Sequence, residues 1–199
     1  DRCRLSDLTF TVFDTETTGL LPGTDEIACI GAVRLLNGRL LHQDSFEQFV
    51  DPGRPMSAES ARITGIDDAM LRGQPRIEQV LPRFHRYAEE TVLVAHNAAF
   101  DLRFLQLLEE RTGVRFTQPA LDTLLLSEVL HPNLAGHGFE EIAARFGVPV
   151  IGRHTALGDA IMTGEIFLKM VPLLAAAGVV TLKDAREASQ RTWLARLQY

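Results

Sequence analysis

The chain has 199 residues, of which 46% are hydrophobic, and a formal net charge of −6 from 26 acidic and 20 basic side chains. This length suits one well-buried domain, and the negative charge excludes a protein that holds a polyanion by long-range attraction alone. No apolar run reaches the roughly 20 residues of a membrane-spanning helix, and the first residues lack the apolar core of a signal peptide. The cysteines, Cys3 and Cys29, have no metal-binding spacing, so we expect a cytoplasmic protein with no membrane partner.

Apolar residues at strand spacing predict four β-strands, three of them in the first quarter of the chain. Asn37 and Gly38, between the second and third strands, form the dipeptide most typical of a two-residue β-hairpin turn. The fourth strand is a short run rich in valine. The predicted strands span residues 8–14, 26–36, 39–50 and 91–96.

Helices are predicted where apolar residues recur at helical spacing between capping and breaking residues. One short helix starts at Ser57 and ends at Gly65, and the next contains Pro82, which is expected to kink it or to mark its start. Strands in a meander, followed by strands that alternate with helices, predict a layered α/β domain. The predicted helices span residues 57–65, 74–90, 98–113, 121–132, 139–147 and 155–170.

The domain organisation is predicted from where the chemistry-bearing residues end. We expect one domain over residues 1–175 and a helical extension, or the start of a linker, over residues 176–199. The last stretch, "ASQRTWLARLQY", could pack on a partner or on another domain, but an amphipathic helix that covers this domain explains it better.

The first predicted strand ends in two carboxylates. Residues two apart in a strand share a face, so Asp14 lies on the apolar face of Phe10 and Val12, and Glu16 follows if the strand continues. Both acids lie at the carboxyl end of the strand, the edge at which α/β sheets keep their sites. A solvated strand end would explain one acid, but two neighbouring like charges are unfavourable unless a cation or a proton intervenes.

An acid also occupies the apolar stripe of the predicted helix 98–113. Asp101 is three and four residues before Phe104 and Leu105, the spacing of one helix face. The helix macrodipole favours an acid in the first turn. That effect explains why Asp101 is tolerated there, but not why it points inward.

A further acid lies at the start of the last predicted helix. Asp159 shares a face with Met162 and Ile166, and Thr155 is the expected N-cap. Residues five apart in a helix lie about 140° apart, so His154 can converge with Asp159 only from the loop before the helix. A lone histidine in this place would be interpreted as structural or exposed.

Four carboxylates on apolar faces cannot all be buried and ionised without partners, because burial costs several kcal/mol per ion. Protonation of some of them is one solution. A pair of divalent cations is the other, and oxygen ligands suit Mg²⁺ or Mn²⁺. Bound cations would also make the mouth of an acidic site attractive to an anionic substrate.

Three segments carry a family resemblance. "FDTETTG", "HNAAFD" and "HTALGDA", in this order over residues 10–160, resemble the motifs of the DEDDh 3′–5′ exonucleases. That family includes the DnaQ-like proofreading ε subunits of bacterial DNA polymerase III and several enzymes that trim RNA 3′ ends. The resemblance implies a ribonuclease H-like fold, with a mixed five-stranded sheet flanked by helices in three layers. Phe139 stands where family members commonly have leucine, a packing change that leaves the catalytic positions intact.

The resemblance assigns five catalytic residues and two Mg²⁺ or Mn²⁺ ions. It implies that Asp14 bridges both ions, that Glu16 and Asp159 complete the site of the ion that activates water, and that Asp101 serves the second ion. His154 would be the general base, because a neutral imidazole can accept a proton near physiological pH.

The resemblance also implies a set of residues that bind the terminal nucleotide. In the turn after the first strand, backbone N–H groups would approach the nucleotide and Leu20 would pack on its base. Phe100 could stack on a base, but it also fits core packing. His96 and Asn97 are equally well explained as a strand-end cap and a helix N-cap. The full set is Thr15, Thr17, Gly19, Leu20, His96, Asn97 and Phe100.

The expected activity is the release of nucleoside 5′-monophosphates, one at a time, from single-stranded or frayed DNA 3′ ends, in proofreading or repair. An enzyme that trims RNA 3′ ends is the alternative, because the motifs do not report how the site treats the ribose 2′-OH. An inactive nuclease-like binding module is a third interpretation, but it normally lacks one of the carboxylates. A polymerase or a fused domain is left open as a partner.

Overall fold

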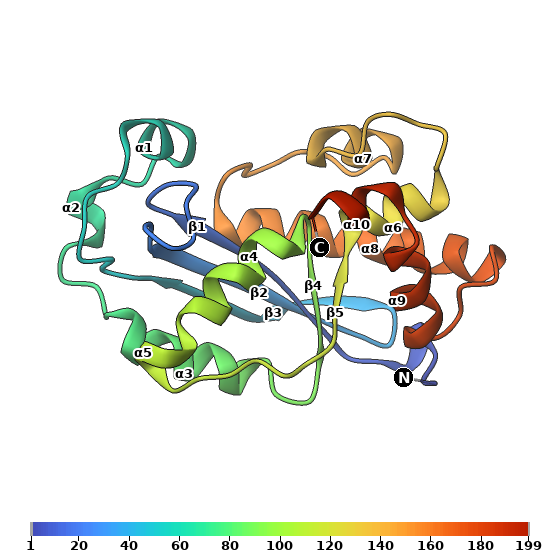
Figure 1. The fold of residues 1–199 in the computed structure, drawn as a ribbon, viewed down its shortest axis with the longest axis horizontal. Helices are drawn as coiled ribbons and strands as arrows, with labels where there is room; N and C mark the ends of the chain where they lie inside the picture. Colours follow the sequence, from blue (N-terminus) through green and yellow to red (C-terminus); the bar gives the residue numbers. More distant parts are fainter. Residues whose placement is uncertain (1, 199) are drawn as a thin grey trace.

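The computed structural model describes residues 2–198, and one mixed five-stranded sheet forms its centre (Figure 1). The strand order is β3-β2-β1-β4-β5; β2 pairs antiparallel with both β1 and β3, whereas β4 pairs parallel with both β1 and β5. The central strand is therefore β1, which carries the first acidic motif. The strands are β1 (Phe10–Thr17), β2 (Ile27–Leu36), β3 (Arg39–Phe49), β4 (Val92–Ala95) and β5 (Ala120–Asp122).

Four strands lie where the sequence predicts them, and the fifth does not. β1 continues past Asp14 and includes Glu16, so the two acids do share one strand face. The helix predicted over 121–132 begins only at Thr123, because the residues before it form β5. Three residues are too few to show a strand period; β5 forms because it pairs with β4.

The helices follow the predictions with four differences. The helix predicted over 98–113 is divided at Leu108. The short helix α2 was not predicted. Pro82 lies inside α3 and not at its start. α8 runs beyond its predicted end, and Leu174 in this added part is fully buried in the core that α8 shares with β1. After a 3₁₀ turn at Leu5–Asp7, the helices up to residue 176 are α1 (Ala58–Thr64), α2 (Asp68–Leu71), α3 (Ile77–Tyr87), α4 (Ala98–Leu107), α5 (Glu109–Thr112), α6 (Thr123–Leu130), α7 (Phe139–Arg145) and α8 (Ala156–Ala176).

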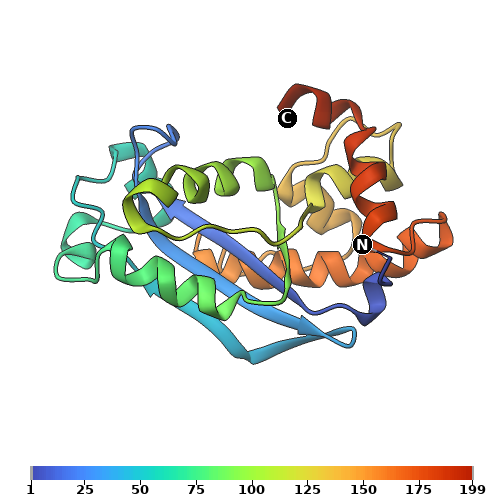
Figure 2. The ribbon, with the colours of Figure 1, turned by 60° about the horizontal axis from the view of Figure 1, so that its bottom comes forward.

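Two hydrophobic cores, one on each face of the sheet, give the molecule three layers (Figures 1 and 2). On one face, Phe10 and Val12 of β1 pack with α8, α6 and α7. On the other face, Phe13 of β1 packs with α3 and α4. Alternate residues of β1 thus point into opposite cores, as a strand covered on both sides requires. Asp14 and Glu16 continue the row of Phe10 and Val12, on the face that α8 covers.

The last part of the described chain forms two more helices, α9 (Leu182–Gln190) and α10 (Trp193–Gln198). Thr181 and Asp184 form a capping box at the start of α9, and Thr181 also bridges to Arg4 near the other end of the chain. α9 packs against α6 and β5. The division at residue 175 stays a prediction, and its outer limits, residues 1 and 199, lie outside the described residues. Within residues 2–198, every helix is too short or too polar to cross a membrane.

Candidate active site

The two acids of β1 lie next to each other on one face of the central strand. Asp14 pairs with Gly31 of β2, and Glu16 pairs with Cys29. The register of the pairing shifts between Glu16 and Thr17, and Thr17 then pairs with Ile27. Both acids are half-buried, so the strand delivers two carboxylates to a partly closed surface.

Gly31 determines how closely α8 approaches these acids. A β-carbon at Gly31 would lie 2.2 Å from the backbone nitrogen of Leu157 and 2.4 Å from the carbonyl carbon of Ala156. The absence of a side chain therefore lets the first turn of α8 rest directly on the strand beside Asp14. Thr155 caps this turn through the N–H of Gly158, at 3.2 Å.

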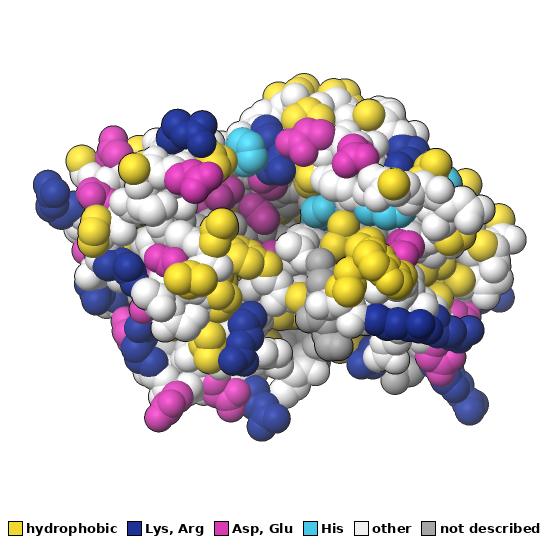
Figure 3. Space-filling view, turned by 45° about the horizontal axis from the view of Figure 1, so that its top comes forward, with side chains coloured by type: hydrophobic (Ala, Val, Ile, Leu, Met, Phe, Trp, Pro, Cys, Tyr) yellow, Lys and Arg dark blue, Asp and Glu magenta, His cyan; other side chains and the backbone are white. Residues whose placement is uncertain are grey.

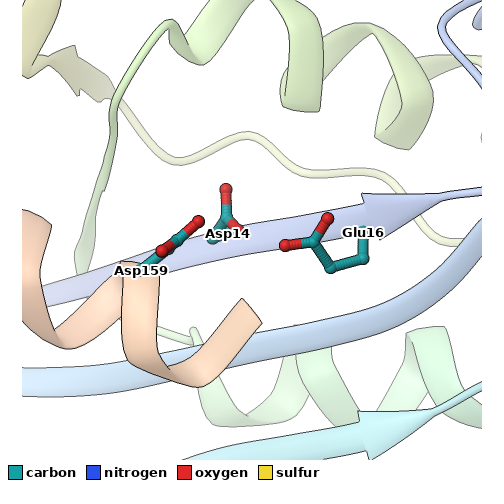
Figure 4. A group of neighbouring side chains, drawn as sticks. All are labelled: Asp14, Glu16 and Asp159. Atoms are coloured by element: carbon teal, nitrogen blue, oxygen red, sulfur yellow. The ribbon is translucent and has the colours of Figure 1, made fainter. Parts of the chain in front are cut away.

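Because the first turn of α8 lies there, Asp159 joins the two strand acids. Ligand oxygens of Asp14, Glu16 and Asp159 all lie within 4.8 Å of one another. Figure 4 shows the three carboxylates directed toward a common space, two from β1 and one from α8. In the space-filling view, acidic side chains gather in a hollow of the surface, with histidine and basic side chains beside it (Figure 3).

The fourth acid, Asp101, comes from α4, the helix that packs on the opposite face of the sheet from α8. Asp101 lies in the first turn of α4, is 3% exposed, and accepts a hydrogen bond from the hydroxyl of Thr15. Thr15 lies between Asp14 and Glu16 in β1, so its hydroxyl links the α4 acid to the strand of the other two. The start of α4 is itself held by Asp122, which accepts from the N–H groups of Asn97 and Ala98 at 2.9 and 3.0 Å.

Burial raises the pKa values of all four carboxylates, and neighbouring acids add to the effect at Asp14 and Glu16. Burial, followed by the charges of Asp101, Glu16 and Asp159, raises the pKa of Asp14 well above its ordinary range. Burial and then the charge of Asp159 raise the pKa of Glu16 to about 8, and burial raises that of Asp101 to about 7. Burial also raises the pKa of Asp159, opposed first by the charge of Arg153. Without added cations the cluster therefore binds protons strongly.

This environment fits divalent cations. The donor set consists of carboxylate oxygens, the ligands that Mg²⁺ and Mn²⁺ prefer. The oxygens lie close enough to share an ion, and the raised pKa values report a local excess of negative charge that a cation would relieve. The cluster of Asp14, Glu16 and Asp159 can therefore hold divalent metal, whereas Asp101 is linked to it through the hydroxyl of Thr15.

His154 lies in the loop before α8, as the sequence predicts. Its backbone has a φ of +70°, an uncommon conformation for a residue with a side chain that tends to occur at functional sites. In this conformation its N–H donates to Asp159 at 3.1 Å. The loop thus ties the half-buried histidine directly to one of the acids.

His96, Asn97 and Phe100 line the start of α4. The ring of His96 stacks edge-on against Phe139, and its Nδ1 is 3.0 Å from the hydroxyl of Thr123. Burial lowers the pKa of His96 to about 4, so this ring is neutral at physiological pH. Asn97 is exposed and makes no side-chain cap, and Phe100 is half-buried against the core.

The turn after β1 exposes apolar surface next to the acids. Thr17 donates to the carbonyl of Gly19 at 2.6 Å, and Leu20 that follows is 73% exposed. Asp25 holds the turn by accepting from the N–H of Leu21 at 3.0 Å and from the hydroxyl of Thr18 at 2.9 Å. Leu20 is therefore presented to solvent by a well-tied turn.

Three residues that shape the site were not identified from the sequence. Gly31 could have been, because a glycine inside a strand pattern suggests a close backbone approach. Asp122 carried a weaker signal, an acid just before an apolar helical run, which is typical of an N-cap. Arg153 carried none, because its contacts with Asp159 and with Glu140 of α7 depend on how the loop before α8 folds.

Comparison with known proteins agrees with this geometry. A model of the exonuclease family RNase_T matches residues 11–167. The chain is 49% identical over 180 residues to a DNA polymerase III subunit epsilon-like protein of Rhodobacter capsulatus, an alignment that covers 89% of this chain and 26% of that protein. It is 41% identical over 175 residues to the PolC-type DNA polymerase III of Caldanaerobacter subterraneus, covering 88% and 12%. The chain thus spans about a quarter or less of these relatives.

Solved structures are similar in fold. Exonuclease X in complex with 5′ overhanging duplex DNA has a TM-score of 0.72 at 24% identity, covering 90% of this chain and 99% of that one. E. coli exonuclease I in complex with a dT13 oligonucleotide has a TM-score of 0.73 at 18% identity, covering 86% and 43%. At these identities the likeness shows the fold alone, and it confirms the predicted ribonuclease H-like sheet flanked by helices.

Proposed function

Because the chain belongs to the exonuclease family, in its DnaQ-like 3′–5′ branch, we propose that it removes nucleotides one at a time from DNA 3′ ends in a metal-dependent reaction. The substrate is a single-stranded or frayed end, and the products are nucleoside 5′-monophosphates. One observation carries the proposal. Carboxylate oxygens of Asp14, Glu16 and Asp159, which come from two distant segments of the chain, all lie within 4.8 Å of one another.

Each acid has a proposed role. Asp14, between the other carboxylates, would contact both ions, Glu16 and Asp159 would hold one of them, and Asp101 would hold the other. Two Mg²⁺ or Mn²⁺ ions, when bound, would polarise the phosphodiester, activate water and stabilise the leaving oxygen. Thr15 keeps Asp101 oriented through its hydroxyl.

His154 is the proposed general base. Its imidazole would accept the proton of the attacking water, and the hydrogen bond from the backbone N–H of His154 to Asp159 keeps the loop beside the acids. His96 is neutral at physiological pH because burial lowers its pKa to about 4, but its Nδ1 is engaged with Thr123, which suits a positioning role beside the nucleotide and not proton transfer.

The terminal nucleotide is proposed to lie between the turn after β1 and the start of α4. Leu20, exposed in its tied turn, packs on a base, and the backbone of Thr15, Thr17 and Gly19 lines the approach. His96, Asn97 and Phe100 contact the nucleotide from the other side. DNA is favoured because two similar relatives are named for DNA polymerase III, and a polymerase or a domain of the same polypeptide is the proposed partner. Both cysteines are free thiols, as suits the cytoplasm.

The test is an assay with labelled oligonucleotides. DNA and RNA strands of one sequence, labelled at the 5′ or the 3′ end, are incubated with the protein in Mg²⁺, Mn²⁺ or EDTA. We expect a ladder of 5′-labelled DNA fragments that shorten stepwise, immediate release of a labelled mononucleotide from the 3′ label, and no reaction in EDTA. Faster shortening of RNA would reassign the substrate, and no shortening of either strand would refute the proposal.

A further inference from the structure

Arg153 is a basic side chain placed against the acid cluster, immediately before His154. Its Nη1 donates to Asp159 at 2.5 Å, and its Nε donates to Glu140 at 2.8 Å. Its guanidinium carbon also lies 4.3 Å from the ring centre of Phe139, a cation–π distance. The arginine is therefore held on three sides, with 26% of its side chain exposed.

Asp159 uses both carboxylate oxygens in this arrangement. One accepts from the N–H of His154 at 3.1 Å, and the other accepts from Arg153. An ion coordinated by Asp159 thus meets a positive charge that is already bound to the same carboxylate, and two cations at one carboxylate repel each other.

We propose, building on the function proposed above, that Arg153 is a built-in counter-ion that holds Asp159 until a divalent ion displaces it. In the metal-free protein the guanidinium offsets repulsion among the acids, since buried charges need partners. When an ion binds, Asp159 turns from arginine to metal. Arg153 is thus a positioning residue that sets how much metal the site needs.

The surroundings of Arg153 explain why it can release Asp159 without leaving the site. Glu140, on a side chain that is 61% exposed, still balances its charge from the solvent side. The Phe139 ring still covers its guanidinium face, a cation–π contact that does not involve Asp159. The arginine therefore has two contacts that do not depend on Asp159.

Titration calorimetry with Mn²⁺ alone tests the proposal, on wild type, Arg153→Gln and Arg153→Lys. Arg153→Gln removes the competing charge, so we expect Mn²⁺ to bind roughly tenfold more tightly, the order of effect of one nearby like charge. Arg153→Lys keeps the charge and is expected to bind as wild type does. The melting temperature of Arg153→Gln in EDTA should fall by a few degrees, because the acids lose their counter-ion.

Arg111→Gln is the matched control. Arg111 also joins two carboxylates, Glu26 at 2.9 Å and Glu78 at 3.1 Å, but neither is one of the proposed metal ligands. Its loss should leave Mn²⁺ affinity unchanged. Equal or weaker Mn²⁺ binding by Arg153→Gln would overturn the counter-ion role while leaving the proposed function in place. If the wild-type protein bound no Mn²⁺, both the counter-ion role and the proposed function would be refuted.

Discussion

Asp14 and Asp122 both lie in the sheet, but they are stabilised in opposite ways. Asp122, 4% exposed at the end of β5, accepts hydrogen bonds from three backbone N–H groups, those of Asn97, Ala98 and Leu124, at 2.8–3.0 Å. Asp14, in β1, faces other carboxylates, and burial, followed by the charges of these neighbours, raises its pKa. A carboxylate that accepts several hydrogen bonds holds secondary-structure elements together. A carboxylate among like charges costs stability, and its presence is best explained by a ligand that the folded protein binds.

The largest expected effect comes from removing the central acid. Asp14→Asn keeps the size of the side chain but removes a charge on which both ion positions depend, so activity should fall on the order of 10³-fold or more. The melting temperature in EDTA should rise, because repulsion is relieved. Oligonucleotide cleavage and calorimetric melting measure the two effects. Full activity, or a clear loss of stability, would place Asp14 with Asp122 among the structural acids.

A second variant tests whether the acids depend on the close approach of α8. In Gly31→Ala the new β-carbon meets the backbone of Leu157 and Ala156, so α8 must shift and carry Asp159 away from Asp14. We expect Mn²⁺ affinity to fall by roughly 10–100-fold, as for other residues that orient metal ligands. Gly23→Ala is the control, because a β-carbon there meets no atom within 4 Å. Unchanged affinity in Gly31→Ala would show that the approach is not needed.

Asp122, the structural acid of the comparison, is predicted to affect the stability of the fold. Asp122→Ala leaves three backbone N–H groups without their acceptor, at an expected cost of about 2–3 kcal/mol. The melting temperature should fall by roughly 4–12 °C for a domain of this size, with metal present or absent. Differential scanning calorimetry measures this change. A melting temperature within a degree of wild type would mean that Asp122 is not the structural acid of the pair.

The last prediction is a pH dependence of the metal-free protein. The folded-state pKa of Glu16 is raised from 4.5 to about 8, so the folded state holds this proton more tightly than the unfolded state does. The resulting stabilisation is complete below about pH 4.5 and is lost as the pH rises through about 8. We expect the melting temperature in EDTA to fall across this window, and less so in Glu16→Gln. A rise in wild type would contradict the crowding of the acids.

Much of the site could be predicted because its acids interrupt local patterns. The period of two in β1 places Asp14 and Glu16 on an apolar face, and the helical period does the same for Asp101 and Asp159. His154 was correctly placed in the loop before α8 from the N-cap at Thr155. The resemblance then supplied the expectation that these residues act together.

What the sequence did not predict depends on contacts between distant segments. β5 is a strand only because β4 offers it a partner. The contacts of Arg153 depend on the fold of the loop before α8, in which His154 has a positive φ that no local pattern predicts. Asp122 has the sequence pattern of an N-cap for α6. Its contact with the start of α4 could not be predicted, because it depends on the parallel pairing of β4 and β5.

Anomalous diffraction from a crystal soaked in Mn²⁺ and a nucleoside 5′-monophosphate tests the central claim most directly. The account predicts two peaks roughly 3.5–4 Å apart, both in contact with Asp14, one also with Glu16 and Asp159 and the other beside Asp101. Peaks at other residues, or no peak in the hollow that these acids line, would contradict it.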